Sequence, residues 1–538
     1  MALSPGVYTK ETDLTFNIQS ITANATGYVG MFTWGPVQKV VDITTNESEL
    51  VQRFGIPTVQ NSGFFHAAAN YLTYASPLSL VRVVGIDAKN AQAPDSVDET
   101  DAALPNLQIR NVEHYETIDL TGYSILGRYP GTYVNGVKVS MANSEGLADW
   151  DYTNLFMYSP KDVDTYNIVL IDTLGTISGT VGTILERYEL MQLTPGTKKT
   201  DGTSAYLKDA IETQSNYILF GDLEKIVPVD GIYEQTLAGG VDDADTSTVD
   251  LSIGWSAFES KDEVEIIRAF TSFHPDVAKL KAVDVAESRQ DAIVMIAPPL
   301  DAVYNTVNQV DSVKNYFSSV LNRSSSYAFN VDNWKLVRDK YNDMNIWIPT
   351  DSDAAGLHAR TFTEAEAWFS PAGFNRGHLK NTIRLAWSSN EKQRDVLYPL
   401  GINSIVAFKG EGTVLFGDRT ALTTPSAFSR INVRTLFIVI KKAIAQASRG
   451  LLFELNDEIT RAIFRNASNR YLTDVKGRRG IYDFKVICDE SNNPGQVIDS
   501  NEFVGDIYVK ASRSINFIHL NFISTGTGTD FTELENVS

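Results

Sequence analysis

The sequence LYPLGINSIVAFKGEGTVLFGDRTAL at residues 397–422, followed by INVRTLFIVIKKAIAQASRG at residues 431–450, decides how the C-terminal third folds. The first stretch holds two apolar runs that predict strands, and the second predicts a long helix. Residues 371–488 contain 19 Lys and Arg against 9 Asp and Glu, a local net charge of +10 in a chain of net charge −20. A basic block in an acidic protein favours an acidic partner.

Size and composition limit the class of protein. With 538 residues, 43% of them hydrophobic, the chain is too long for a single core, and we expect three or four domains. The acidic balance argues against general nucleic-acid binding, and no apolar run is long enough for a membrane helix. The first residues, MALSPGVYTKE, lack the order of a signal peptide. We therefore expect a soluble protein made in the cytoplasm, with no direct nucleic-acid contact and no membrane insertion.

Two segments alternate between strand and helix patterns, which predicts α/β layers. Residues 21–88 contain the strand pattern GYVGMFTWGP, two helical patterns and the strand pattern LSLVRVVG. In residues 246–370, EVEIIRAFTSFH (263–274) and AKLKAVDVAESRQ (278–290) predict helices, and DAIVMIAPP (291–299) predicts a buried strand. We expect this second segment to be a middle α/β domain of its own.

A β-rich segment lies between these two. Residues 89–105 are rich in Ala, Asp and Pro, which is typical of a linker or an exposed loop. Residues 107–237 contain many short strand patterns broken by Gly, Asn and Pro. The prediction is an inserted, β-rich outer domain at residues 89–245.

Both ends of the chain carry strand-like arms, at residues 1–20 and 507–538. Apolar residues alternate with polar ones in each of them: Leu14, Phe16 and Ile18 near the N-terminus, and Ile518, Leu520 and Phe522 near the C-terminus. This alternation predicts half-buried strands next to flexible sequence. One such strand could be an edge strand of its own domain, but two of them flanking a folded body indicate strand exchange between subunits.

The common motifs of catalysis and cofactor binding are missing. Gly412 and Gly417 have the spacing of a phosphate-binding loop, but Asp418 stands where that loop needs lysine. The acidic stretches that begin at Asp243 and Asp351 lack the later ligands of a calcium loop. The six histidines form no H-E-x-x-H pair, and no G-x-S-x-G motif occurs. We predict no catalytic residue, no cofactor and no metal site, although the many carboxylates leave a carbohydrate-active enzyme open.

The helix predicted at residues 432–449 carries a basic face. At about 100° per residue, four cations fall within an arc of about 100°, and one isoleucine projects into its middle. These residues are Arg434, Lys441, Lys442 and Arg449, with Ile438 between them. An apolar side chain ringed by cations is typical of a docking surface, and a solvated basic face with one stray isoleucine is the alternative. A second helix is predicted to begin at Asn456.

The chain resembles the contractile tail sheath proteins of bacteriophages and related injection machines. The resemblance rests on SPGVYTKE (4–11), GRYPGTYVNGVKV (127–139), ESRQDAIVMIAPP (287–299), SPAGFNRGHL (370–379), residues 397–422, INVRTLFIVIKKAI (431–444), LLFELND (451–457) and ICDESNN (487–493). Two residues depart from the usual pattern: Phe416 stands where the family commonly has Trp, and Asp418 where a smaller or uncharged residue is usual.

This resemblance implies a non-enzymatic subunit of the virion that polymerises as stacked hexameric rings around a tail tube and contracts to drive that tube through the host envelope. It implies further partners in the baseplate and the tail terminator. A conserved inner domain would be built from residues 21–88 and 371–506, the helix at 432–449 would face the tube, and the terminal arms would add strands to neighbouring subunits. The sheath of a headless tailocin or injection system is the close alternative.

Overall fold

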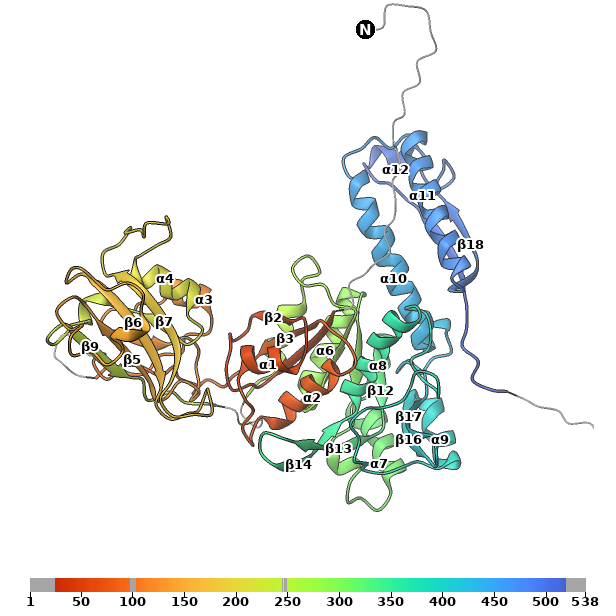
Figure 1. Ribbon diagram of the computed structural model, residues 1–538. Coiled ribbons are helices and arrows are strands. Elements are labelled where there is room, and N and C mark those ends of the chain that lie inside the picture. Colours follow the sequence, from red (N-terminus) through yellow and green to blue (C-terminus); the bar gives the residue numbers. More distant parts are fainter. Residues whose placement is uncertain (1–24, 97–102, 244, 246–248, 519–538) are drawn as a thin grey trace, which may run out of the picture.

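The computed structural model describes residues 25–96, 103–243, 245 and 249–518. It contains three units (Figure 1): a central α/β body, a β-rich unit on one side, and a C-terminal unit of two long helices and a strand pair. The chain is a mixed α/β multidomain protein.

An eight-stranded sheet forms the central body, in the order β17-β16-β12-β11-β10-β1-β3-β2. The inner strands from β16 to β3 are parallel, whereas β17 and β2 pair antiparallel at the two edges. The inner strands are almost wholly buried, as expected for parallel strands that are covered on both faces. The strands are β1 (Thr26–Gly30), β2 (Val40–Ile43), β3 (Leu78–Arg82), β10 (Arg268–Phe270), β11 (Ile293–Ile296), β12 (Ala328–Val331), β16 (Ile402–Phe408) and β17 (Gly412–Phe416).

Helices cover this sheet. Helices α2 and α8 pack against each other. Helix α2 also contacts β1 and β3, and α8 contacts β10, β11 and β12. Helices α5 and α6 also pack against each other, α5 on β1 and α6 on β11. The helices of the body are α1 (Glu47–Phe54), α2 (Ser62–Leu72), α5 (Ser252–Trp255), α6 (Asp276–Arg289), α7 (Gln309–Asn315), α8 (Asp351–Glu364) and α9 (Glu391–Leu397).

The strand order corrects the predicted domain division. Strands β10, β11 and β12 come from residues 246–370, yet they lie between β1 and β16. The prediction of a separate middle domain is therefore wrong, because parallel strands pair with neighbours that are distant in sequence. The helix expected at residues 263–274 is also wrong, since β10 occupies its centre. A short, fully buried apolar run fits a strand and a helix equally well in sequence.

A small antiparallel sheet, β14-β13-β15, extends the body. Its strands are β13 (Trp334–Asp339), β14 (Met344–Pro349) and β15 (Arg384–Leu385). It brings residues from the middle of the chain close to α2, because α2 contacts β14.

The β-rich unit is inserted between β3 and α5. Its main sheet is antiparallel in the order β7-β6-β5-β9, and a strand pair β4-β8 stands beside it. The unit has its own buried core. Its elements are α3 (Val112–Thr117), β4 (Ile125–Gly127), β5 (Val137–Ala142), β6 (Thr165–Asp172), β7 (Thr183–Gln192), α4 (Leu207–Gln214), β8 (Ile218–Phe220) and β9 (Ile232–Thr236).

The C-terminal unit has a third core, formed where α10, α11 and the pair β18-β19 meet. In Figure 1, α10 rises from the central body and connects it to the C-terminal unit. The second helix begins one residue later than expected, since the side chain of Asp457, not Asn456, caps it by accepting from the N–H of Thr460. The elements are α10 (Ile431–Ser448), α11 (Glu458–Gly477), β18 (Ile481–Ile487), α12 (Gly495–Asp499) and β19 (Asp506–Ala511).

Candidate assembly surfaces

Helix α10 does not present the surface that its charge pattern predicted. Ile438 is only 1% exposed and belongs to the core of the central body. Arg434 is buried as well: its guanidinium lies 3.8 Å from the Phe428 ring centre and donates to Ser326 Oγ at 2.6 Å. The prediction that Ile438 is exposed within a basic arc is therefore wrong. The reason is that α10 packs against two cores at once, with Ile438 in one and Leu436 in the other.

Of the other three cations, Lys441 and Arg449 are exposed, whereas the Lys442 side chain is only 16% exposed, and Arg449 follows the last residue of α10. Lys441 is exposed and donates to Gln290 Oε1 at 3.0 Å. Lys442 pairs with Glu265 at 2.7 Å, and Arg449 pairs with Asp262 at 2.9 Å. Desolvation lowers the pKa of Lys441, as do the nearby charges of Arg434 and Lys261. Such surface pairs contribute little to stability and can be exchanged for a partner's carboxylates.

The burial of Ile438 leads to a stability prediction. Replacing Ile438 with Ala is expected to lower the free energy of unfolding by about 2–5 kcal/mol, because it leaves a cavity in the core. The exposed Lys441→Ala change is expected to stay within about 0.5 kcal/mol of the unchanged protein. Urea unfolding of the two variants measures both values. Equal effects would mean that Ile438 is not a core residue.

The β18-β19 pair is an incomplete sheet. The two strands are antiparallel, with Phe484 opposite Val509 and Val486 opposite Ile507, and α11 packs against β18. Within the described part of the chain, no third strand pairs with either of them, so each keeps one open edge. A strand pair alone is marginally stable, and an open edge accepts a further strand.

The C-terminal arm starts later than expected. Residues 507–511 belong to β19, which pairs with β18 of the same chain. Residues 512–518 form no helix or strand, and Ile518 is 75% exposed. The other five arm residues lie outside the described residues: Leu14, Phe16, Ile18, Leu520 and Phe522.

Asp418 anchors the segment that follows β19. This carboxylate is 2% exposed and pairs with Arg430 at 2.9 Å. Its oxygens also accept from Ser514 Oγ at 2.5 Å and from Asn516 Nδ2 at 3.0 Å. Asn516 Nδ2 donates to Tyr398 Oη as well, at 2.9 Å. The segment is thus tied back to the central body before it leaves the described chain. Sequence reasoning missed this role, because it noted Asp418 only as a misfit in a loop.

Removing this anchor should loosen the segment. In Asp418→Ala we expect the amide of Ser512, which donates to the Gly480 carbonyl at 3.1 Å, to exchange hydrogen at least about tenfold faster, since the charged hydrogen bonds that hold residues 514 and 516 are gone. Ser514→Ala with Asn516→Ala should give the same acceleration while the Asp418–Arg430 pair stays intact. The exposed Asp499→Ala is the matched control. Unchanged exchange in both test variants would refute the anchor.

The connection between α10 and α11 exposes large apolar side chains. Phe453 is fully exposed and has a left-handed backbone, with φ of 70°. Three neighbours are more than half exposed: Leu452, Leu455 and Ile459. We call these four residues the apolar tip. An exposed cluster of this kind marks an interaction site. The signal in the sequence is LLFEL, an apolar run between two helices.

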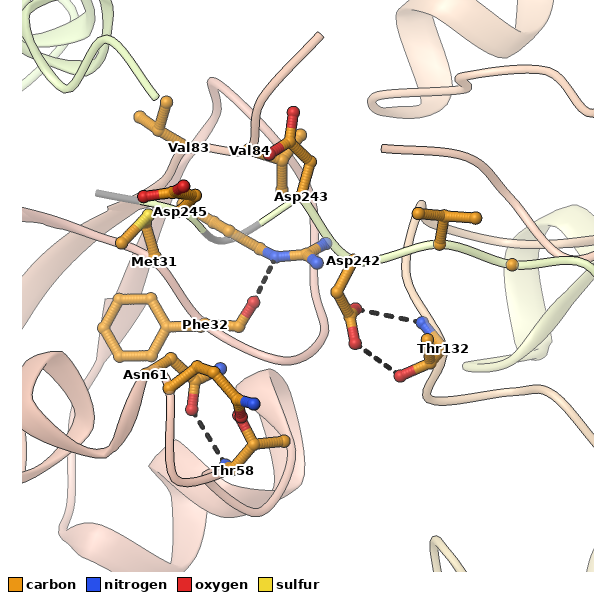
Figure 2. Close-up of a pocket in the computed structure, with 14 residues that line it drawn as sticks. Met31, Phe32, Thr58, Asn61, Val83, Val84, Thr132, Asp242, Asp243 and Asp245 are labelled. Carbon is orange, nitrogen blue, oxygen red and sulfur yellow. Dashed lines mark hydrogen bonds between the residues drawn. The ribbon is translucent and has the colours of Figure 1, made fainter. Parts of the chain in front are cut away.

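Arg82, at the end of β3, joins the β-rich unit to the body. Figure 2 shows Phe32, Thr132 and Asp242 at this junction. Its guanidinium donates to four backbone carbonyls at 2.8–3.1 Å, those of Phe32, Thr33 and Gly35 in the body and Pro130 in the β-rich unit. Burial lowers the pKa of Arg82 to about 10, so the group stays charged at neutral pH. Asp242 accepts from the N–H of Thr132 at 2.9 Å beside a cavity of about 720 Å³. This network fixes the junction.

No three His, Cys, Asp or Glu side chains are placed to hold a metal ion in residues 25–96, 103–243, 245 and 249–518. No helix over the same ranges is long and apolar enough to cross a membrane.

Comparison with known proteins identifies the family. Residues 250–421 match the phage tail sheath protein central domain, and residues 423–525 match the phage tail sheath C-terminal domain. The chain is 31% identical to the tail sheath protein of Salmonella phage ViI, over 99% of this chain and 98% of that protein. This chain belongs to the phage tail sheath family. It is 30% identical to the tail sheath protein of Vibrio phage KVP40, over 99% of both.

Solved sheath structures share the fold of this sheath subunit. The sheath tail protein of Listeria innocua has a TM-score of 0.55 at 13% identity, over 90% of this chain and 94% of that one. A subunit of the sheath complex of an extracellular contractile injection system, in its contracted state, has a TM-score of 0.54 at 13% identity, over 98% of both chains. At such low identity the likeness concerns the fold alone.

Family membership makes the protein a structural subunit of a contractile tail sheath and a component of the virion. Sheath proteins are not enzymes, so the alternative of a carbohydrate-active enzyme has no support.

Proposed function

We propose that this sheath subunit assembles as stacked hexameric rings around the tail tube and contracts to drive the tube through the host envelope. The observation that carries the proposal is the incomplete β18-β19 pair, which has two open edges beside an anchored C-terminal segment. A subunit that needs strands from its neighbours polymerises, because an unpaired edge is a template for pairing.

In this proposal the terminal arms supply the missing strands. Residues 1–20 and the residues after Ile518 extend to neighbouring subunits and complete their β18-β19 pairs. Backbone hydrogen bonds suit this task, since strand pairing survives when the attached body rotates, whereas side-chain interfaces break and re-form in a second arrangement. The extended lattice is metastable, and contraction releases its free energy without a cofactor.

The C-terminal unit faces the tube in this arrangement. The apolar tip supplies the desolvated centre of the contact, and Lys441, Lys442 and Arg449 supply surrounding positive charge. A tube with an acidic outer surface fits such a lining. The other proposed partners are the baseplate and the tail terminator, and assembly takes place in the host cytoplasm.

Electron microscopy of the purified protein tests the proposal. We expect hollow, striated cylinders with sixfold symmetry. Persistent monomers at all concentrations, with or without added tube, would contradict it. The sheath of a headless tailocin would form the same cylinders, and the presence of a capsid on native particles distinguishes the two.

A further inference from the structure

Three polar side chains meet inside the central body. Lys335 comes from β13, Asn70 from α2 and Asp353 from α8. Lys335 and Asp353 are completely buried, and Asn70 is nearly so. Burying a charged lysine costs free energy unless the groups around it compensate for the lost water.

The lysine nitrogen contacts three oxygen acceptors at once. Lys335 Nζ donates to Asn70 Oδ1 at 2.8 Å and to Asp353 Oδ1 at 2.8 Å. Its third donor reaches the backbone carbonyl of Lys380 at 2.7 Å. A buried ammonium needs an acceptor for each of its three N–H groups, and the Asn70 amide oxygen is one of these three acceptors. The amide carbon of Asn70 is thereby held next to an amine.

The other groups of the cluster are also arranged for a reaction. The amide nitrogen of Asn70 donates to Ser352 Oγ at 3.0 Å, so its carbonyl side faces the lysine. The Tyr74 hydroxyl donates to Asp353 Oδ1 at 2.7 Å. The second oxygen of Asp353, Oδ2, is buried and has no hydrogen-bond partner among the described residues. This oxygen is free to carry a proton.

We propose that Lys335 and Asn70 form an intramolecular isopeptide bond, with Asp353 as the proton carrier. A proton passes from the Lys335 ammonium to the Asp353 carboxylate, which leaves a neutral amine. The amine nitrogen attacks Cγ of Asn70, so that an Nζ–Cγ bond forms and the Cγ–Nδ2 bond breaks. The leaving nitrogen takes protons from the amine and from Asp353 and departs as ammonium. Asp353 is a carboxylate again, and no oxidant or reductant is needed.

Two physical effects favour this reaction. Burial lowers the pKa of Lys335, although the charge of Asp353 acts in the opposite direction. The lower pKa raises the fraction of neutral amine, which is the nucleophile. The folded chain also holds both reacting groups in contact, which removes the entropic cost of bringing them together.

The bond would join parts of the chain that are 265 residues apart. It ties α2, from the N-terminal segment, to β13, from the middle of the chain, through a covalent link. This inference goes beyond the proposed function, since it concerns a single subunit. A body stapled in this way resists unfolding when force passes through it during contraction.

The mass of the purified full-length chain tests the proposal. We expect a mass about 17 Da below that of the sequence, allowing for loss of the initiator Met, because one ammonia is released. Trypsin should then yield residues 54–82 joined to residues 324–338, since modified Lys335 is no longer cleaved. A full mass, or a deficit located in other peptides, would overturn the bond and leave a buried ion pair.

Variants give matched comparisons. Asn70→Ala and Lys335→Arg should restore the full mass, and Asp353→Asn should do so by slowing the reaction. Lys380→Arg removes the neighbouring lysine, whose own Nζ donates to the carbonyl of Thr73 at 2.6 Å and lies over the Tyr74 ring, and this variant should keep the deficit. Loss of the deficit in Lys380→Arg alone would count against the assignment of Lys335. The measurement on the unchanged protein decides the question even where a variant fails to fold.

Discussion

Protein that lacks residues 1–20 is expected to fold but not to form cylinders. Under the proposed function these residues donate a strand to the open β18-β19 edge of a neighbour, so their loss removes the bond between subunits while the three cores stay complete. We expect the number of cylinders seen by electron microscopy to fall at least about 100-fold, the size expected when a central contact is lost. The melting temperature of the body should not change.

The two faces of the N-terminal arm provide the control for this experiment. Replacing Leu14, Phe16 and Ile18 with Asp should be as damaging as the deletion, because a half-buried strand places these residues on its apolar face. Replacing Thr15, Asn17 and Gln19 with Asp alters the opposite face and should be tolerated far better. Normal cylinders from the truncated protein would exclude strand donation by this arm.

Loss of the apolar tip is expected to release the tube without preventing self-assembly. Leu452→Asp combined with Phe453→Asp puts two carboxylates where the proposed contact is desolvated. The new charges would also be repelled by a tube surface that is expected to be acidic. We expect co-sedimentation of tube with sheath to weaken at least about 100-fold. Folding should be unaffected, since both side chains are exposed.

The β-rich unit supplies the comparison for the tip. Leu174→Asp with Val181→Asp introduces the same charges at two other exposed apolar residues and should leave tube binding unchanged. Equal loss in both double variants would point to net charge as the cause. Normal tube binding by the tip variant would remove the tip from the interface. Cylinders that form without tube would separate a failure of this contact from a failure of the arms.

Patterns within short stretches predicted a large part of this protein. The period of apolar residues indicated α2, α6 and α10, and the broken strand patterns of residues 107–237 indicated a β-rich unit. Such patterns are readable because a helix or strand face is set by neighbours a few residues away. The same reasoning failed at β10, where a three-residue buried strand gives no period.

The sequence by itself determined the family, most of the local elements and the net charge of each segment, since these depend on residue type and spacing. Only the tertiary structure decided that β10, β11 and β12 share a sheet with β1 and β16, that Ile438 is buried, and that Asp418 holds residues 514 and 516. It also placed Lys335 beside Asn70. The physical reason is that these contacts join residues tens to hundreds of positions apart, and such contacts are fixed by the packing of whole elements.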